Sequence, residues 1–219
     1  VIERNRLRAN VEVIDELLNV VASSVGSLSN PSRLSNTFQS VKGLKIKNET
    51  ISSYLDCFID AYILSKAYRY DIKGRSYIDT PLKYYFTDIG LRNARLNFRQ
   101  QEENHIMENI LYNELIARDF NIDVGVVEYN HVDENGKKVR TQLEVDFVVN
   151  KTDKRYYIQS ALTVANEEKR KQETNSLNRI DDSYTKIVVV RDNILPWIDE
   201  KGVQYINIED FLLERINLL

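Results

Sequence analysis

The sequence has a single cysteine, two histidines and no long apolar run, and each scarcity excludes a class of protein. Cys57 alone cannot form an internal disulfide framework, and we expect it in the core. His105 and His131 do not have the spacing of zinc ligands. The longest apolar runs, such as 187–190, are long enough for a strand but not for a membrane span. We therefore predict a cytoplasmic protein with no membrane partner.

Two sequence signals are also missing. No GxxxxGK[ST] phosphate-binding motif occurs in the 219 residues, so we expect no ATP hydrolysis by this chain alone. No charged, apolar and small-residue signal pattern opens the chain. It begins at Val1 and its one methionine is Met107, so we expect it to be part of a longer protein. Its length suits one large domain or two small ones.

Charge is distributed unevenly along the chain. Residues 1–98 carry 14 Lys and Arg against 10 Asp and Glu, whereas residues 99–219 carry 16 against 23. Any DNA binding should therefore involve the N-terminal part, because phosphates attract basic side chains. The excess of +4 is modest, and many domains that bind no nucleic acid carry as much. Charge supports DNA binding only in combination with the fold.

Helical periodicity begins the N-terminal part. Apolar residues recur at the helical period over residues 4–25, from Leu7 onwards. The segment 27–31 has turn and cap chemistry and ends that helix. A short helix follows at 32–41 and ends near Gly43.

A third helix and two strands complete this part. The helix begins at 47–50, where Asn48 has the chemistry of an N-cap, and its apolar stripe ends with Tyr62 and Ile63. The segment 65–87 alternates like a two-stranded β-wing. Helix, short helix, helix and wing is the order of a winged helix, which we predict over residues 1–96.

A winged helix would place its third helix in a DNA major groove and its wing on phosphates. The residues that we expect to contact DNA are Lys45, Lys47, Asn48, Thr50, Arg69, Lys73, Arg75 and Lys83. An alternative stays open, since winged helices also serve as protein-binding modules and polar residues at a helix start are ordinary caps. The wing tyrosines are expected to be packing residues.

Residues 97–219 have the pattern of an α/β domain. The expected elements are a helix at 101–119, strands at 124–131, 142–150 and 155–161, a helix at 166–178, a strand at 186–192, and a final short strand and helix. The apolar run 187–190 should form a central strand. Together with the N-terminal part, this predicts an α/β (α+β) fold, in which a winged helix precedes a restriction-endonuclease-like mixed sheet flanked by helices.

Glu144 and Asp146 lie two residues apart on the second of these strands, and therefore on one face. Gln159 follows on the next strand, and Glu108 lies on the helix before the strands. This layout resembles the core of PD-(D/E)XK nucleases, which holds Mg²⁺ between acids on adjacent strands and activates water with a lysine two residues further on. Here Gln159 replaces the second acid and Ala161 replaces the lysine.

The nuclease resemblance implies a vestigial catalytic site of Glu108, Glu144, Asp146 and Gln159, with Glu108 and Asp146 as Mg²⁺ ligands. Loss of one anionic ligand and of the lysine predicts little or no cleavage. An active Mg²⁺-dependent DNA nuclease stays open as an alternative if Lys169 or Lys171 replaces the lost lysine.

Most of the chain from about residue 25 resembles the C-terminal region, of unknown function, of prokaryotic AAA-type ATP-binding proteins. The resemblance is carried by ETISSYLDCFIDAYIL (49–64), RYDIKG (69–74), PLKYYFTDIGLRNA (81–94), MENILYNEL (107–115), EVDFVV (144–149), YYIQSA (156–161) and SLNRIDDSYTKIVVVRD (176–192). Glutamine is typical of that family at position 159. Two features depart from the family: no glycine precedes Glu108, and Gln172-Glu173 stands where an arginine-glutamate pair is usual.

This second resemblance implies an ATPase domain upstream in the same polypeptide. It suggests an accessory region that binds DNA or a protein partner and whose nuclease-like domain is degenerate. A winged-helix transcriptional or toxin-antitoxin-like regulator is the other alternative. Assembly into a homo-oligomer stays open.

Overall fold

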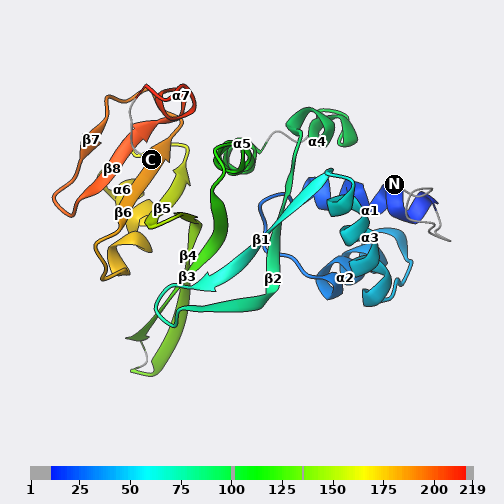
Figure 1. Ribbon diagram of the computed structural model, residues 1–219. Coiled ribbons are helices and arrows are strands. Elements are labelled where there is room, and N and C mark those ends of the chain that lie inside the picture. The colour runs from blue at the N-terminus through cyan, green and yellow to red at the C-terminus, as the bar shows by residue number, and fades with distance from the viewer. Residues whose placement is uncertain (1–10, 100–101, 135, 216–219) are drawn as a thin grey trace. The chain divides into compact units, whose positions relative to one another are not determined.

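The computed structural model describes residues 11–99, 102–134 and 136–215 (Figure 1). The elements are α1 (Val11–Ser23), α2 (Pro31–Lys42), α3 (Asn48–Asp60), β1 (Leu64–Asp71), β2 (Ser76–Phe86), α4 (Ile89–Arg95), α5 (Glu103–Ala117), β3 (Asn121–Val132), β4 (Lys138–Lys151), β5 (Lys154–Ala161), α6 (Glu167–Thr174), a 3₁₀ turn (Leu177–Arg179), β6 (Thr185–Val190), β7 (Trp197–Ile198), β8 (Val203–Asn207) and α7 (Ile208–Leu212). The strands form one mixed sheet in the order β2-β1-β3-β4-β5-β6-β8-β7. The predicted mixed α/β class, with a sheet flanked by helices, is confirmed.

Two compact units divide the chain. Unit 1 comprises Val1–Ala67 and Asp79–Asn109, and unit 2 comprises Tyr68–Ile78 and Ile110–Leu219. Each unit is built from two separate stretches of sequence. The sequence instead predicts a single boundary, between residues 96 and 97. The tip of the β1–β2 hairpin belongs to unit 2 because β1 pairs there with β3, Arg69 lying opposite Val124.

Local sequence explains the ends of the unit 1 helices. The Asn30 side chain caps α2, Pro31 lies in its first turn, and Gly43 ends it in the left-handed conformation with φ of 66°. The helix extends one residue beyond the predicted range of 32–41 at each end and stops before Gly43, as predicted. The predicted cap of α3 is wrong: Lys47 is the N-cap residue and makes no side-chain capping bond, whereas Asn48 is already helical.

Helices α1, α2 and α3 share one apolar core. Its most deeply buried side chains include Leu17, Val21, Leu34, Phe38, Ile51, Leu55 and Phe58. Burying one such side chain contributes about 1.5–3 kcal/mol relative to leaving it exposed. Tyr62 was predicted to join this core but is 81% exposed, because it lies beyond the end of α3 with φ of 56°. Leu7 lies outside the described residues.

Unit 1 also contains an isolated β-bridge. Ser29, in the connection between α1 and α2, forms an antiparallel bridge with Leu82 on β2. Two backbone hydrogen bonds of 2.7 and 2.8 Å join these residues. Helix α4 was not predicted; it begins after Asp88, whose side chain accepts a hydrogen bond from Leu91 N.

The sheet of unit 2 combines antiparallel and parallel pairs. Strands β3, β4 and β5 pair antiparallel, and β6 is parallel to both β5 and β8. Residues 187–190 are completely buried in β6, as their β-branched composition predicts. In α5, Leu111 and Leu115 are completely buried, whereas Ile116 is 46% exposed. Helix α6 is shorter than predicted and ends at Thr174.

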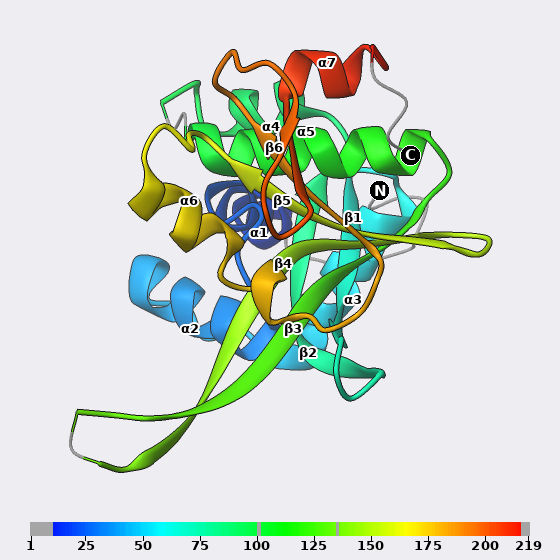
Figure 2. The same ribbon diagram turned by 90° about the vertical axis from the view of Figure 1, so that its left-hand side faces the viewer.

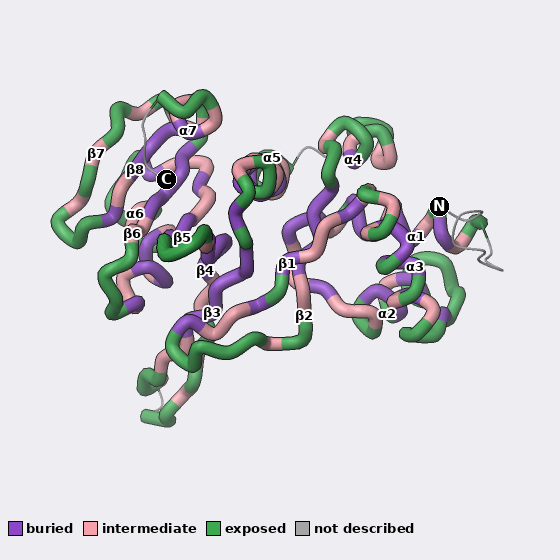
Figure 3. Tube along the Cα trace, viewed as in Figure 1, coloured by how far each residue is buried: buried purple, intermediate pink, exposed green. Residues whose placement is uncertain are grey.

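Strands β3 and β4 extend beyond the rest of the sheet as a two-stranded arm (Figure 2). Their pairing continues from Val127 and Leu143 to Val132 and Lys138, whereas β5 pairs only with residues 147–151 of β4. Burial decreases toward the tip of the arm (Figure 3). Within the described residues, no helix has the length and apolar character needed to cross a bilayer.

Candidate functional site

Asp146 and Gln159 lie side by side on the neighbouring strands β4 and β5. The strand register pairs Phe147 with Ile158, which places Asp146 opposite Gln159. Asp146 is buried, and its Oδ2 accepts a 2.8 Å hydrogen bond from Ser160 N. The Asp146 backbone N lies 3.4 Å from Gln159 Oε1, a long contact. The structure therefore brings together two of the predicted site residues within unit 2.

The neighbouring positions lack the groups that cleavage requires. Gln159 offers a neutral amide oxygen where a nuclease of this type has a carboxylate. Ala161, at the lysine position, is 4% exposed and belongs to the apolar core of unit 2. A lysine side chain there would have to place a charge against that core, which is costly. Glu144 lies two residues before Asp146 in β4, opposite Val126.

The lysines considered as replacements lie on α6. Lys169 and Lys171 are both exposed, and Lys171 Nζ pairs with Glu167 Oε1 at 2.7 Å. Solvent screens such an exposed pair, so it has little effect on stability. Their exposure is typical of lysines on the solvent side of a helix.

Glu108 belongs to unit 1, where it is the centre of a buried polar cluster. Its Oε1 accepts hydrogen bonds from Lys83 Nζ at 2.8 Å and from Tyr85 Oη at 2.7 Å. Gly26 lies against the same carboxyl group with φ of 70°, and a β-carbon there would be 3.3 Å from Glu108 Oε2. The close approach and the left-handed backbone both favour glycine at this position. The charge of Glu108 is thus compensated by a buried ammonium group within unit 1.

The predicted metal ligands do not fit Mg²⁺. This ion prefers about six oxygen ligands in octahedral geometry, with anionic oxygens among them. In the ranges 11–99, 102–134 and 136–215, no three His, Cys, Asp or Glu side chains are grouped so that they could hold a metal ion. Lys83 already neutralises Glu108, and a backbone N–H already donates to Asp146. Mg²⁺ is therefore not assigned to this pair.

Two of the predicted DNA contacts are not accessible. Lys83 is 3% exposed and forms the ion pair with Glu108. Arg69 is 9% exposed, and its Nη2 donates to Gln142 Oε1 at 3.2 Å. Each residue lies on a strand of the β1–β2 hairpin where its side chain is directed into the protein, which disfavours both as DNA contacts.

Four of the predicted DNA contacts lie at the start of α3. Lys45, Lys47 and Asn48 are exposed there, and Thr50 is partly buried. The exposed face of α3 itself is acidic. It carries Glu49, Asp56 and Asp60, and the helix contains no Lys or Arg. Three carboxylates would repel the phosphates of a DNA groove. This face is therefore unsuited to enter DNA.

Lys73 and Arg75 are exposed in the turn between β1 and β2. Asp71 fixes this turn, because its Oδ1 accepts hydrogen bonds from the backbone N–H groups of Lys73 and Gly74 at 3.1 and 2.9 Å. Both basic residues line a cavity of about 510 Å³ in unit 2. The rest of its lining comes from the end of β1, from β5 and from the segment before β6: Tyr70, Ile72, Arg155, Ile180, Asp181, Asp182 and Tyr184.

Sequence reasoning missed the contribution of Arg155 and Tyr184 to this cavity. Each is separated from the β1–β2 turn by about 80 residues or more, and only the pairing of the strands brings them together. No local motif marks either residue.

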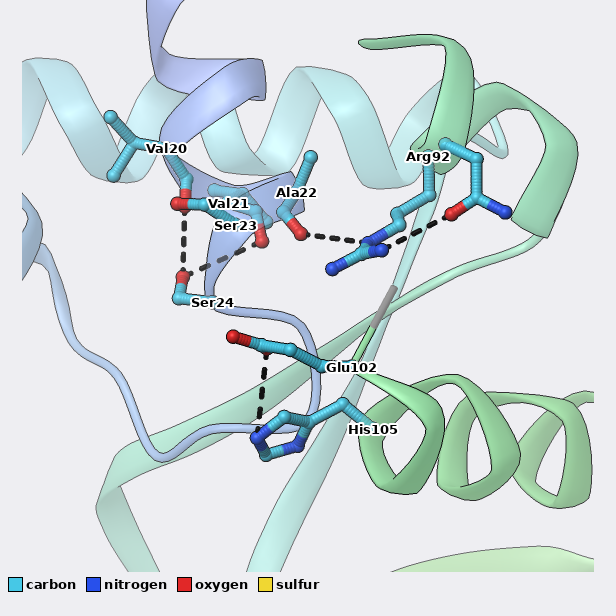
Figure 4. A network of polar contacts seen from close by, with 9 residues as sticks. Val20, Val21, Ala22, Ser23, Ser24, Arg92, Glu102 and His105 are labelled. Atoms are coloured by element: carbon cyan, nitrogen blue, oxygen red, sulfur yellow. Dashed lines mark hydrogen bonds and ion pairs between the residues drawn. The ribbon is translucent and has the colours of Figure 1, made fainter. Parts of the chain in front are cut away.

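A second polar network ties α1 to α4 in unit 1 (Figure 4). Arg92 is completely buried, and its Nε donates to Ala22 O at 3.0 Å while Nη1 donates to Asn93 Oδ1 at 3.1 Å. Burial lowers the pKa of Arg92, and the nearby Glu102 opposes this shift. Glu102 Oε2 also lies 4.0 Å from His105 Nε2. The network joins a helix end to a neighbouring helix, and we assign it a structural role.

Comparisons with known proteins agree with a region of unknown function. Residues 2–102 match the model of a domain of unknown function (DUF8612). An uncharacterized protein of Haemophilus influenzae (strain ATCC 51907 / DSM 11121 / KW20 / Rd) is 31% identical over 205 residues, covering 94% of this chain. The match covers 47% of that relative, so the chain spans about half of its length. No solved structure matches the chain.

Proposed function

We propose that this chain is an accessory region of a larger AAA-type ATP-binding protein, and that its nuclease-like unit binds nucleic acid without cutting it. The observation that carries the proposal is the site on β4 and β5. Asp146 and Gln159 are adjacent there, as in a nuclease core, while the position of the lysine is closed by the burial of Ala161. The strand arrangement of a nuclease core without its second carboxylate and its lysine favours binding of nucleic acid over cleavage.

The order of elements supports the nuclease-like assignment of unit 2. An acid-bearing helix, α5, precedes three antiparallel strands, and α6 then leads to the parallel strand β6. The strand acid and the polar residue of the next strand occupy adjacent positions in this order. The resemblance to AAA-type proteins and the absence of a phosphate-binding motif from the 219 residues favour an ATPase elsewhere in the polypeptide.

Unit 1 is proposed to be a winged-helix-like module that contacts protein. Its three helices are followed by β1 and β2, in the order expected of a winged helix, and the bridge between Ser29 and Leu82 joins β2 to the connection between α1 and α2. The acidic exposed face of α3 disfavours DNA as its partner. Charge complementarity instead favours a basic protein surface, for which the ATPase domain of the same polypeptide is the proposed source.

A cleavage assay with a matched variant tests the proposal. The 219-residue chain is incubated with supercoiled plasmid and with single-stranded DNA in the presence of Mg²⁺ or Mn²⁺. We expect no cleavage above that seen with Asp146→Ala, while both proteins retain DNA binding in a titration at low salt. Cleavage that disappears in Asp146→Ala would show an active nuclease. Absence of DNA binding by both proteins would refute the nucleic-acid part of the proposal.

A further inference from the structure

The cavity in unit 2 brings together three basic side chains from two distant segments. Lys73 and Arg75 come from the β1–β2 turn, and Arg155 comes from β5. In the described part of the chain, none of the three forms an ion pair with a carboxylate. The three cations outnumber the two carboxylates of the lining, Asp181 and Asp182, so an anionic ligand would be attracted to the cavity.

Arg155 is held in place before any ligand arrives. Its Nε donates to Asn150 Oδ1 at 2.7 Å, and its guanidinium carbon lies 5.4 Å from the ring centroids of both Tyr70 and Tyr184. Such contacts between a cation and aromatic rings restrict the side chain. A guanidinium group fixed through Nε keeps its terminal N–H groups in the fork geometry that suits phosphate oxygens.

The lining of the same cavity also offers an aromatic ring and hydrogen-bond acceptors. Tyr184 is 44% exposed, and its ring makes an edge contact with Tyr157, the two centroids being 6.3 Å apart. Asp182 is fixed by Tyr157, whose hydroxyl donates to its Oδ2 at 2.6 Å. Asp181 is exposed beside it and lines the cavity. A flat base with amino groups matches this combination of ring and carboxylate.

We propose that this cavity is a binding site for a nucleoside phosphate. Lys73, Arg75 and Arg155 bind the phosphate, the base stacks on Tyr184, and Asp181 accepts a hydrogen bond from the base. Guanine is the favoured base, because its N1–H and N2–H₂ groups can both donate to one carboxylate. The volume of about 510 Å³ lies in the range of small-molecule sites. A free nucleotide and a phosphorylated strand end share this chemistry, so the site does not depend on the function proposed above.

Calorimetric titration of the 219-residue chain with four probes tests the site. The probes are GMP, guanosine, inorganic phosphate, and a short single-stranded oligonucleotide with a 5′-phosphorylated guanosine. We expect GMP to bind at least about ten-fold more tightly than guanosine or phosphate, because it engages the basic side chains and the Tyr184 ring together. Tighter binding of the oligonucleotide than of GMP assigns the site to strand ends, and the reverse order assigns it to free nucleotides. Equal affinities for GMP and phosphate, or no binding of GMP, would overturn the proposal.

Matched variants separate the site from general charge attraction. Arg155→Lys keeps the charge but loses the fork and should weaken GMP binding by about five- to ten-fold. Tyr184→Ala should weaken it by a similar factor through lost stacking, while Tyr184→Phe should bind like the parent chain. Arg170→Lys is the control, because Arg170 lies 5.5 Å from the ring of Trp197 at a different cavity. Thermal melting of each variant establishes that it is folded. An equal loss in the control, or no loss in folded Arg155→Lys and Tyr184→Ala, would contradict the site.

Discussion

Two sets of basic residues, one in each unit, have opposite surroundings. Unit 1 buries Lys83 against Glu108 and Arg92 against backbone and amide oxygens. Unit 2 leaves Lys73, Arg75 and Arg155 at a cavity. Lys83 and Arg92 thus serve the fold of unit 1, whereas the three basic residues of unit 2 line a cavity where a ligand could reach them. The charge of a sequence segment therefore does not locate a binding surface until the buried pairs are known.

The largest expected effect comes from breaking the buried pair of unit 1. Lys83→Met should lower the free energy of unfolding by about 3–5 kcal/mol, because it leaves the buried carboxylate of Glu108 without its cation. Urea denaturation measures this loss. Lys45→Met, at an exposed position, is the control and should change stability by less than about 0.5 kcal/mol.

The double variant Lys83→Met with Glu108→Gln sharpens this prediction. It removes both charges, so it should be more stable than Lys83→Met alone. Equal stabilities of Lys83→Met and the parent chain would show that unit 1 does not depend on its buried cation.

Asp146→Asn should have a smaller, purely structural effect. Asp146 Oδ2 accepts a hydrogen bond from Ser160 N, and loss of the carboxylate weakens this bond. We expect a loss of about 1–2 kcal/mol in the free energy of unfolding, with no change in DNA cleavage. A loss of cleavage with unchanged stability would instead identify Asp146 as catalytic.

The smallest effect concerns the pH dependence of unit 2. Burial raises the pKa of Asp123 above its ordinary value of 3.8, while the hydrogen bond from Tyr77 and the charge of Arg155 oppose the shift. A raised pKa in the folded state means that stability falls as pH rises through that pKa. Asp123→Asn should therefore be more stable than the parent chain at pH 7, by less than about 1 kcal/mol.

This advantage of Asp123→Asn should disappear below pH 3.8, where the carboxyl group is protonated in both the folded and the unfolded chain. Urea denaturation at several pH values measures it. Asp153→Asn, at an exposed position, is the control. A stability difference that does not vary with pH would contradict the assigned cause.

Local patterns predicted much of the fold. Pro31 and Gly43 marked the ends of α2, and alternating or β-branched residues marked β4, β5 and β6. These signals depend only on neighbours along the chain. The alternation of β2 also placed Lys83 on the same face as Tyr85, but it carried no sign of their shared partner Glu108, which lies 25 residues from Lys83.

The candidate sites could be predicted only in part. Adjacent strands brought Asp146 and Gln159 together, as their spacing implied. The cavity around Arg155 depends on the parallel pairing of β1 with β3 and of β5 with β6, which joins segments far apart in sequence. Pairing of this kind is set by the whole sheet, and no short motif encodes it.

The most direct test of the account is a titration of labelled DNA by two double variants. The contrast between the units predicts that Lys73→Glu with Arg75→Glu weakens binding about ten-fold or more at low salt, because phosphate contacts dominate affinity. Lys45→Glu with Lys47→Glu, beside the acidic face of α3, should weaken binding by less than about three-fold. Both variants change the net charge equally, so general attraction cancels in the comparison. Equal losses in the two variants, or a larger loss from the pair at α3, would contradict the account.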